Sequence, residues 1–190
     1  MDELVAERII VRRQGVGTFV TTHGQTRLFF DFFRIVPREG PPEYPDTRTL
    51  EFRSDRADVF EANKLRLQVG DDVLRVRNLR LLSATPIIVD DLVLPEQLFP
   101  ALTEQVFTRR ESTIYNLYQT RYGMNVLRTT DRVHAVAAKP DVAVLLGLRR
   151  GAPALEIIRV AFTYDDIPIE LRRSTVNSDN YDYISELGKD

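Results

Sequence analysis

Cysteine and tryptophan are absent from the 190 residues, and histidine occurs only twice. Without cysteine the chain has no disulfide, no thiolate metal ligand and no cysteine nucleophile, which fits a reducing compartment. His134 falls in a strand pattern and His23 in a polar segment. No nucleophile–base pair and no metal-ligand spacing occurs, so we predict no catalytic residue, no metal site and no cofactor.

Long apolar runs and a large excess of one charge are also missing. No run approaches the length of a membrane span and the N-terminus lacks a signal-peptide hydrophobic region, so we expect no membrane contact and a cytoplasmic location. The formal net charge of -2 gives no bulk electrostatic case for nucleic-acid binding, which would need a local patch. With 43% hydrophobic and 28% charged residues, the composition is typical of one globular domain with room for a small appendage.

Residues 73–95 contain two aliphatic, β-branched runs around a short polar turn. This pattern predicts an antiparallel hairpin. Four charged residues lie within the apolar runs: Arg75, Arg77, Arg80 and Asp90. Because an unpaired buried charge is too costly to keep, these side chains either face water or bind something.

The length of the hairpin turn decides which residue faces Asp90. A two-residue turn sets Asp90 across from Arg77, which gives a structural salt bridge. A three-residue turn sets Asp90 across from Asn78 and leaves both free to hydrogen-bond a ligand, with Arg172 near as a counter-charge. The sequence leaves both registers open.

The hairpin has a second copy further along the chain. The pattern Ala-x-x-Leu-x-Leu-x-x-Gly, strand, turn, Pro-Ile, strand begins at residue 62 and returns with an offset of 81 residues before the turn and 82 after it. On this match Asp90 corresponds to Arg172, and Asn78 to Arg159. Two copies related by a pseudo-twofold axis would bring polar positions of opposite sign towards one cleft. The alternative is that any two helix–glycine–hairpin units look alike.

The remaining segments show strand and helix patterns. We expect strands at 47–53, 126–138, 154–164 and 168–176, helices at 57–65, 95–107 (interrupted at Pro100), 112–122 and 141–146, and a closing element at 181–187. Ser54 or Asp55 is the expected N-cap of the first helix, and Ser112 that of helix 112–122, which ends at Gly123. This order predicts an α+β domain with a mostly antiparallel sheet.

A small basic hairpin with glycines at its tip is predicted at residues 11–20. The run Arg12-Arg13-Gln14-Gly15-Val16-Gly17-Thr18-Phe19-Val20 resembles the wing of the winged helix-turn-helix in GntR-family bacterial transcription regulators. The resemblance implies that residues 1–20 are the end of the recognition helix and the wing, and that residues 21–27 are a linker. The DNA-binding residues that it implies are Arg12, Arg13, Gln14, Gly15, Gly17 and Thr18.

This hairpin suits DNA physically, because arginines can contact phosphates and glycines let the backbone approach the minor groove. A basic hairpin that simply faces solvent is the alternative. The helices that precede a wing are absent from the sequence, so we expect this chain alone to bind DNA poorly or not at all.

The rest of the chain, residues 28–190, resembles the UTRA domain, the effector-binding module of the HutC branch of GntR regulators, whose fold is similar to chorismate lyase. The resemblance rests on residues spread over nearly the whole domain: Val73-Leu74-Arg75, Arg80, Pro86, Asp90, Leu94-Pro95, Thr113-Ile114-Tyr115, Tyr122-Gly123, Leu146-Gly147, Pro153, Arg159, Pro168, Glu170, Asp179 and Tyr181. It implies a cleft for a small molecule.

In this family an Arg-x-Arg strand lines the cleft, and members that bind sugar phosphates use both arginines. Arg80 matches the second arginine, but Asn78 replaces the first, and Val176 stands where a tyrosine is expected. We therefore expect Arg80 to bind a single carboxylate or phosphate, with backbone N–H groups of a helix that starts at Thr113 nearby. The predicted effector-binding residues are Phe33, Arg34, Asn78, Arg80, Asp90, Thr113, Tyr115, Glu170 and Arg172.

These resemblances imply a ligand-responsive DNA-binding regulator, a repressor that works as a homodimer and whose full-length form binds operator DNA. The effector is expected to be anionic. Two alternatives stand beside this hypothesis. One is an enzyme of the chorismate-lyase type; the other is a ligand-free dimerisation module, which a pocket filled by the aromatic residues 29–33 would favour.

Overall fold

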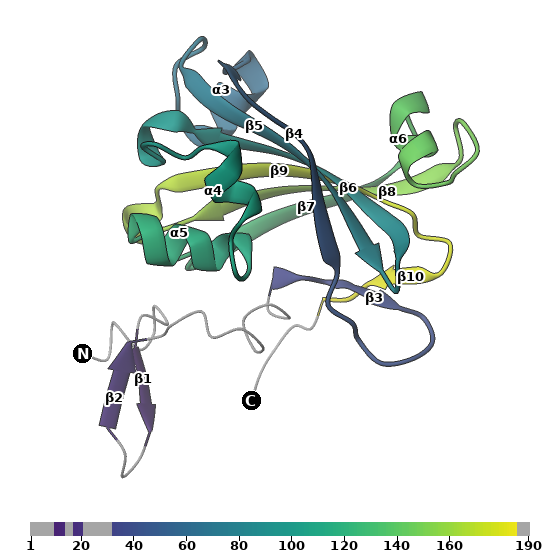
Figure 1. Ribbon diagram of the computed structural model, residues 1–190, viewed down its shortest axis with the longest axis horizontal. Coiled ribbons are helices and arrows are strands. Elements are labelled where there is room, and N and C mark those ends of the chain that lie inside the picture. The colour runs from purple at the N-terminus through teal and green to yellow at the C-terminus, as the bar shows by residue number, and fades with distance from the viewer. Residues whose placement is uncertain (1–9, 14–16, 21–31, 186–190) are drawn as a thin grey trace.

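The computed structural model describes residues 10–13, 17–20 and 32–185 (Figure 1). Strands β1 (Ile10–Arg13) and β2 (Gly17–Val20) pair in antiparallel fashion, which confirms the predicted small hairpin. Five predicted features lie wholly or partly outside the described residues: the helix end at residues 1–9, the tip residues Gln14 and Gly15, the linker 21–27, residues 28–31, and the last two residues of the closing element 181–187. No helix within the described ranges is long and apolar enough to cross a membrane.

The centre of the fold is a six-stranded sheet in which every neighbouring pair is antiparallel. Its strands, in spatial order, are β4 (Asp46–Arg56), β5 (Asp72–Leu82), β6 (Thr85–Pro95), β9 (Pro168–Val176), β8 (Pro153–Phe162) and β7 (Arg128–Ala137). A separate pair joins β3 (Ile35–Pro37) to β10 (Tyr181–Tyr183). The predicted α+β class with a mostly antiparallel sheet is confirmed.

The two predicted copies form the two halves of this sheet. Strand, helix and hairpin follow in the same order in each half, and the last strands of the copies, β6 and β9, pair at the centre. Asn78 lies opposite Asp90 in one hairpin, and Arg159 lies opposite Arg172 in the other. These are the correspondences that the repeat predicted, so the repeat is confirmed in the strand register.

The first hairpin closes with a two-residue turn, and yet Asp90 faces Asn78 rather than Arg77. The register shifts between Arg80 and Leu81, because β6 carries one extra residue, Ile87, in a β-bulge. The second hairpin shifts at the equivalent place, where Ile169 is the extra residue. The predicted link between a two-residue turn and an Asp90–Arg77 salt bridge is wrong, because the bulge shifts the register by one residue.

Replacing Ala84 by glycine is expected to raise the free energy of unfolding by about 0.5–1 kcal/mol. Both turn residues, Ser83 (φ 45°) and Ala84 (φ 66°), have the left-handed backbone that disfavours a Cβ atom. Urea denaturation measures the change. The control Ala137→Gly, at an exposed strand end without positive φ, should lose about 0.5–1 kcal/mol. An equal loss of unfolding free energy in Ala84→Gly and Ala137→Gly would rule out strain in the turn.

The helices begin and end at identifiable caps. They are α3 (Val59–Leu65), α4 (Glu104–Thr108), α5 (Ile114–Tyr122) and α6 (Pro140–Leu145), with short 3-10 turns at Glu96–Leu98 and Tyr164–Asp166. Asp58 caps α3 in a capping box with Glu61, so the predicted caps Ser54 and Asp55 were wrong. Thr113 caps α5 instead of Ser112, and Gly123 ends it as predicted. The predicted helix 95–107 is divided into the first 3-10 turn and α4.

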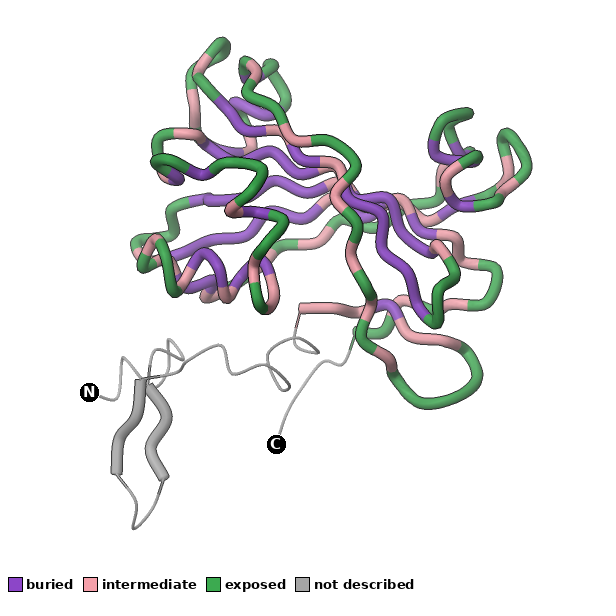
Figure 2. Tube along the Cα trace, in the orientation of Figure 1, coloured by how far each residue is buried: buried purple, intermediate pink, exposed green. Residues whose placement is uncertain are grey.

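The helices cover both faces of the sheet. Tyr118 of α5 and Phe107 of α4 pack on one face, in a cluster with Leu92 and Leu94. On the other face α3 and α6 cover separate clusters formed by the alternate residues of the same strands. Figure 2 shows the central strands buried between these layers.

Candidate functional site

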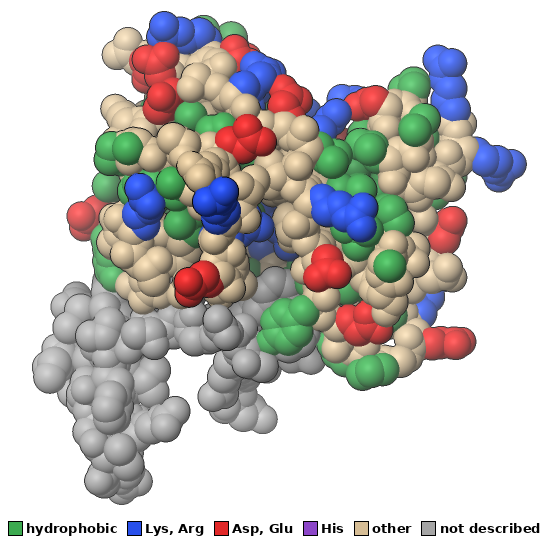
Figure 3. All heavy atoms as spheres, viewed as in Figure 1, with side chains coloured by type: hydrophobic (Ala, Val, Ile, Leu, Met, Phe, Trp, Pro, Cys, Tyr) green, Lys and Arg blue, Asp and Glu red, His purple; other side chains and the backbone are tan. Residues whose placement is uncertain are grey.

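A cavity of about 460 Å³ lies on the sheet face that α4 and α5 cover. Its floor comes from β5, β6, β8 and β9, and its walls from residues 32–35, residues 44–47, the segment before α5, and Tyr183 of β10. Apolar side chains such as Phe33, Ile88 and Ile157 share this wall with arginines. Figure 3 shows this side of the molecule, with basic side chains around and within a central hollow.

Two rows of polar side chains cross the sheet beneath the cavity, one running through each hairpin of the repeat. The first row consists of the cross-strand partners Thr49, Asn78, Asp90 and Ser174. The second row consists of Asp131, Arg159 and Arg172. Ser174 and Arg172 are two residues apart on β9, so the rows meet at the centre of the sheet. The repeat therefore brings polar positions of opposite sign together, as predicted.

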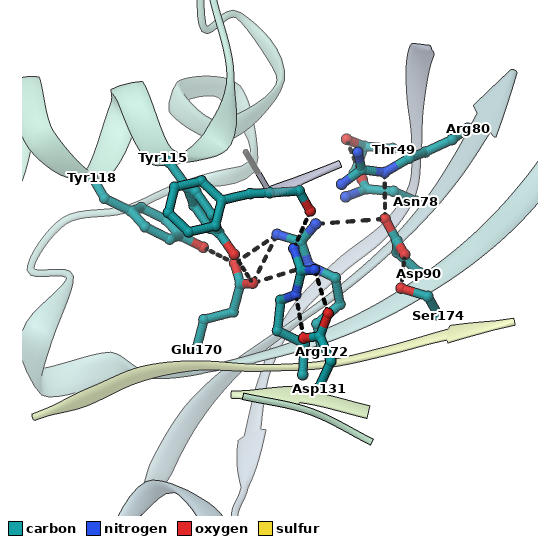
Figure 4. A network of polar contacts seen from close by, with 12 residues as sticks. Thr49, Asn78, Arg80, Asp90, Tyr115, Tyr118, Asp131, Glu170, Arg172 and Ser174 are labelled. Carbon is teal, nitrogen blue, oxygen red and sulfur yellow. Dashed lines mark hydrogen bonds and ion pairs between the residues drawn. The ribbon is translucent and has the colours of Figure 1, made fainter. Parts of the chain in front are cut away.

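Asp90 is the centre of the first row. It accepts hydrogen bonds from the Arg80 guanidinium and the Ser174 hydroxyl, and Arg172 Nη1 lies 3.9 Å from its Oδ2 (Figure 4). Burial raises the pKa of Asp90, but the charges of Arg80 and Arg172 lower it below its ordinary value. Asp90 is therefore an ionised carboxylate that already has its partners inside the protein.

Asn78 lies beside this pair and is fully buried. The Thr49 hydroxyl donates a hydrogen bond to Asn78 Oδ1 at 3.0 Å. Asn78 Nδ2 is buried and has no hydrogen-bond partner among the described residues. An orphaned buried donor of this kind is uncommon in native proteins.

Glu170 organises the junction between the sheet and α5. Arg172 donates to both carboxylate oxygens, with Nε 3.0 Å from Oε1 and Nη2 2.9 Å from Oε2. The hydroxyls of Tyr115 and Tyr118 donate to the same carboxylate at 3.3 and 2.7 Å. Burial and the charge of Glu170 raise the pKa of Tyr115 to about 12, and that of Tyr118 well above its ordinary value. Both hydroxyls therefore stay protonated and hold α5 against the sheet.

Arg159 forms the third ion pair of the site. Its Nε and Nη2 donate to the two oxygens of Asp131 at 2.7 and 2.6 Å, and its Nη1 donates to the Phe32 carbonyl. The Tyr183 hydroxyl adds a bond to Asp131 at 2.8 Å. Burial raises the pKa of Asp131, but Arg159 and Tyr183 lower it below its ordinary value. This pair connects residue 32 and β10 to the sheet.

Most of the predicted effector-binding residues meet at the cavity. Those that line it are Phe33, Arg34, Arg80, Asp90, Thr113, Tyr115 and Arg172. Asn78 and Glu170 do not line it and lie fully buried beside the lining residues. The Thr113 hydroxyl accepts a hydrogen bond from the Asn116 backbone N–H, so it serves as the helix cap. Contact of any of these residues with an effector stays a prediction.

Arg77, the alternative partner of Asp90, lies on the opposite face of the sheet. It pairs with Asp91 at 2.7 Å and with Asp141 of α6 at 2.9 Å. Alternation along β5 separates it from Arg80, because residues an odd number apart point to opposite faces. Its charge belongs to the packing of α6 and not to the cavity.

Sequence reasoning did not place Arg110, Asp131, Arg159, Ser174 and Tyr183 in the site. Two of them had a signal. Arg159 is the repeat equivalent of Asn78, and Ser174 follows Arg172 by two residues on the same strand face. Arg110 had none, because it lies in an irregular segment between two helices.

The comparisons with known proteins agree with this geometry. The model of the UTRA domain family matches residues 43–182. The mannosyl-D-glycerate transport/metabolism system repressor MngR of Escherichia coli is 25% identical over 185 residues, which cover 95% of this chain and 75% of that protein. The transcriptional regulator Rv0792c of Mycobacterium tuberculosis is 29% identical over 164 residues, 85% of this chain and 60% of that protein. The relatives are transcriptional regulators.

Solved structures show the same fold. The ligand-binding domain of a GntR-family transcriptional regulator from Bordetella bronchiseptica superposes with a TM-score of 0.78 and 34% identity, over 83% of this chain and 98% of that one. PhnF from Mycobacterium smegmatis has a TM-score of 0.71 at 21% identity, over 100% of this chain and 82% of that one, which shows the fold alone. The chain belongs to the UTRA domain family of GntR-type transcriptional regulators.

Proposed function

We propose that this chain senses a small anionic effector in the cavity beneath α5 and acts as the effector-binding part of a transcriptional repressor. The observation that carries the proposal is the cavity itself, about 460 Å³ in volume, with five arginines in its wall. Those arginines are Arg34, Arg80, Arg110, Arg159 and Arg172. A volume of this size suits a small organic molecule, and a wall rich in guanidinium groups favours an anion.

The names of the relatives support a small effector. One relative is named for mannosyl-D-glycerate, and others for fructoselysine utilization. A cavity that mixes apolar and charged walls suits compounds that carry both a polar body and an ionised group. The ligand-free alternative needs a pocket filled by residues 29–33. Of these, Phe32 and Phe33 line a cavity that keeps a volume of about 460 Å³, and residues 29–31 lie outside the described residues.

The regulator works as a homodimer on operator DNA in the cytoplasm. Two chains are needed because a symmetric operator presents two half-sites. The implied DNA contacts are the hairpin residues Arg12, Arg13, Gln14, Gly15, Gly17 and Thr18. An effector changes DNA affinity only to the extent that it binds one dimer arrangement more tightly than another.

A melting-temperature screen tests the proposal. A ligand that binds only the folded protein must raise the apparent stability, so one class of carboxylates or phosphate esters should shift the midpoint with concentration. Neutral analogues of the same size should not. If no anion shifts the midpoint at millimolar concentration, the anionic effector is wrong.

We infer that the chain is not an enzyme, since its relatives are transcriptional regulators. The specific alternative is a lyase that acts on chorismate. Incubating the protein with chorismate and measuring 4-hydroxybenzoate tests it directly. Formation of product in proportion to protein concentration would replace the sensing proposal.

A further inference from the structure

The arginines of the cavity wall differ in whether the protein already neutralises them. Three of the five have carboxylate partners: Arg80 with Asp90, Arg159 with Asp131, and Arg172 with Glu170. Within the described part of the chain, Arg34 and Arg110 have no ion pair. An anion that binds in the cavity therefore meets two arginines that it can neutralise without displacing a carboxylate.

Arg110 has the surroundings of an unsatisfied cation. Its Nη1 donates to the Phe107 carbonyl at 2.6 Å, and its guanidinium lies 4.8 Å from the Phe107 ring. Its Nε is buried and has no hydrogen-bond partner among the described residues. Burial and the like charges of Arg80 and Arg172 lower the pKa of Arg110 to about 10. Among the described residues, Tyr118 offsets these effects in part, and no carboxylate contributes.

Arg34 differs in this respect. Its charge is one of those that lower the pKa of Asp131, so a carboxylate already lies near it. The charge of Arg34 also lowers the pKa of Tyr183, which lies on β10 at the edge of the cavity. The charged groups that act on Arg110 are instead Arg80 and Arg172, which lower its pKa, and no carboxylate is among them.

We propose that Arg110 binds the anionic group of the effector with its guanidinium, which lines the cavity. This inference rests on the proposed sensing function and names the residue that selects the ligand class. A guanidinium carries paired N–H donors in one plane, and a carboxylate or a phosphate monoester can accept two of them at once. Arg80, which the sequence favoured for this role, is bonded to Asp90 and would have to be released first.

The test compares Arg110→Gln and Arg110→Lys with the wild-type chain by thermal melting and titration calorimetry. The probes are inorganic phosphate, glucose 6-phosphate and gluconate, with glucose as the neutral control, all at constant ionic strength. A charge-assisted bidentate contact predicts at least about a tenfold loss of affinity in Arg110→Gln. Arg110→Lys keeps the charge but not the planar guanidinium, so its affinity for the anions should lie between those of the wild type and Arg110→Gln.

Arg109→Gln is the matched control, because Arg109 is the exposed neighbour of Arg110 and does not line the cavity. It should bind the probes as the wild type does. Without any probe, Arg110→Gln should melt at the wild-type temperature or higher, since an uncompensated charge is removed. The comparison between glucose 6-phosphate and gluconate shows whether the bound group is a phosphate or a carboxylate.

The outcomes separate the two proposals. If the wild type binds an anion and Arg110→Gln binds it within twofold, the assignment of Arg110 is overturned while the sensing function stands. If no probe anion binds to the wild type, the proposal of an anionic effector is wrong, and the assignment of Arg110 is wrong with it. A lower melting temperature in Arg110→Gln without probe would show that Arg110 serves to stabilise the fold.

Discussion

Replacing Glu170 by alanine should lower the free energy of unfolding by about 3–5 kcal/mol, measured by urea denaturation. Glu170 is fully buried and accepts four hydrogen bonds, two of them from Arg172. The alanine variant leaves the Arg172 guanidinium without its main partner in a buried site, and it also removes the acceptor for Tyr115 and Tyr118. The loss is large because desolvated charges and donors remain when their partner is removed.

Three further variants test that explanation. Glu170→Gln keeps an acceptor for the tyrosines but removes the charge, so it should lose less than the alanine variant. Glu170→Leu combined with Arg172→Met removes both charges and should recover much of the loss, because a buried ion pair and an apolar pair have similar stability. Glu39→Ala, in an exposed loop, should change stability by less than about 0.5 kcal/mol. A loss below 1 kcal/mol in Glu170→Ala would show that water solvates Arg172 in the native protein.

The architecture could be predicted from the sequence because the repeated pattern indicates which residues of the two hairpins occupy equivalent positions. One strand–turn–Pro-Ile–strand pattern, found twice, matched Asn78 with Arg159 and Asp90 with Arg172, and the strands pair in that way. The same pattern contains the bulge, since Ile87 and Ile169 are the isoleucines that follow its two prolines. A repeat therefore fixes register better than the length of one turn does.

Local boundaries were less predictable for physical reasons. Serine, threonine and aspartate near a helix start all can cap it, so Asp58 and Thr113 could not be separated from Asp55 and Ser112 by residue type. The choice depends on where the chain must turn to pack its apolar side. The irregular segment that contains Arg110 has no period at all, so no pattern placed that residue at the cavity.

The site shows the same limit. Sequence reasoning grouped Arg80, Asp90, Glu170 and Arg172 correctly near one cavity, but it treated them as available to a ligand. In the fold they bind one another first, because a buried charge needs a partner whether or not an effector is present. Which charged side chain remains without a partner depends on the three-dimensional arrangement, so it cannot be predicted from the order of residues in the sequence.

Replacing Asp90 by alanine should lower the free energy of unfolding by about 3–5 kcal/mol in chloride, and phosphate should restore part of it. The variant leaves Arg80 buried in the cavity wall without a carboxylate, with Arg172 close by. Phosphate can occupy the position of the lost carboxylate, and at ten times its dissociation constant it would restore about 1.4 kcal/mol. Urea denaturation in matched chloride and phosphate buffers measures both effects.

Asp91→Ala is the matched control, because Asp91 is the next residue on β6 and its partner Arg77 is partly exposed on the opposite face. A pair that water reaches contributes about 0–1 kcal/mol, so this variant should lose little, and phosphate should stabilise it no more than it stabilises the wild type. The Asp90 variant must gain more from phosphate than the wild type does, since it has both Arg80 and Arg110 unpaired. An equal gain in both proteins would mean that phosphate does not reach Arg80.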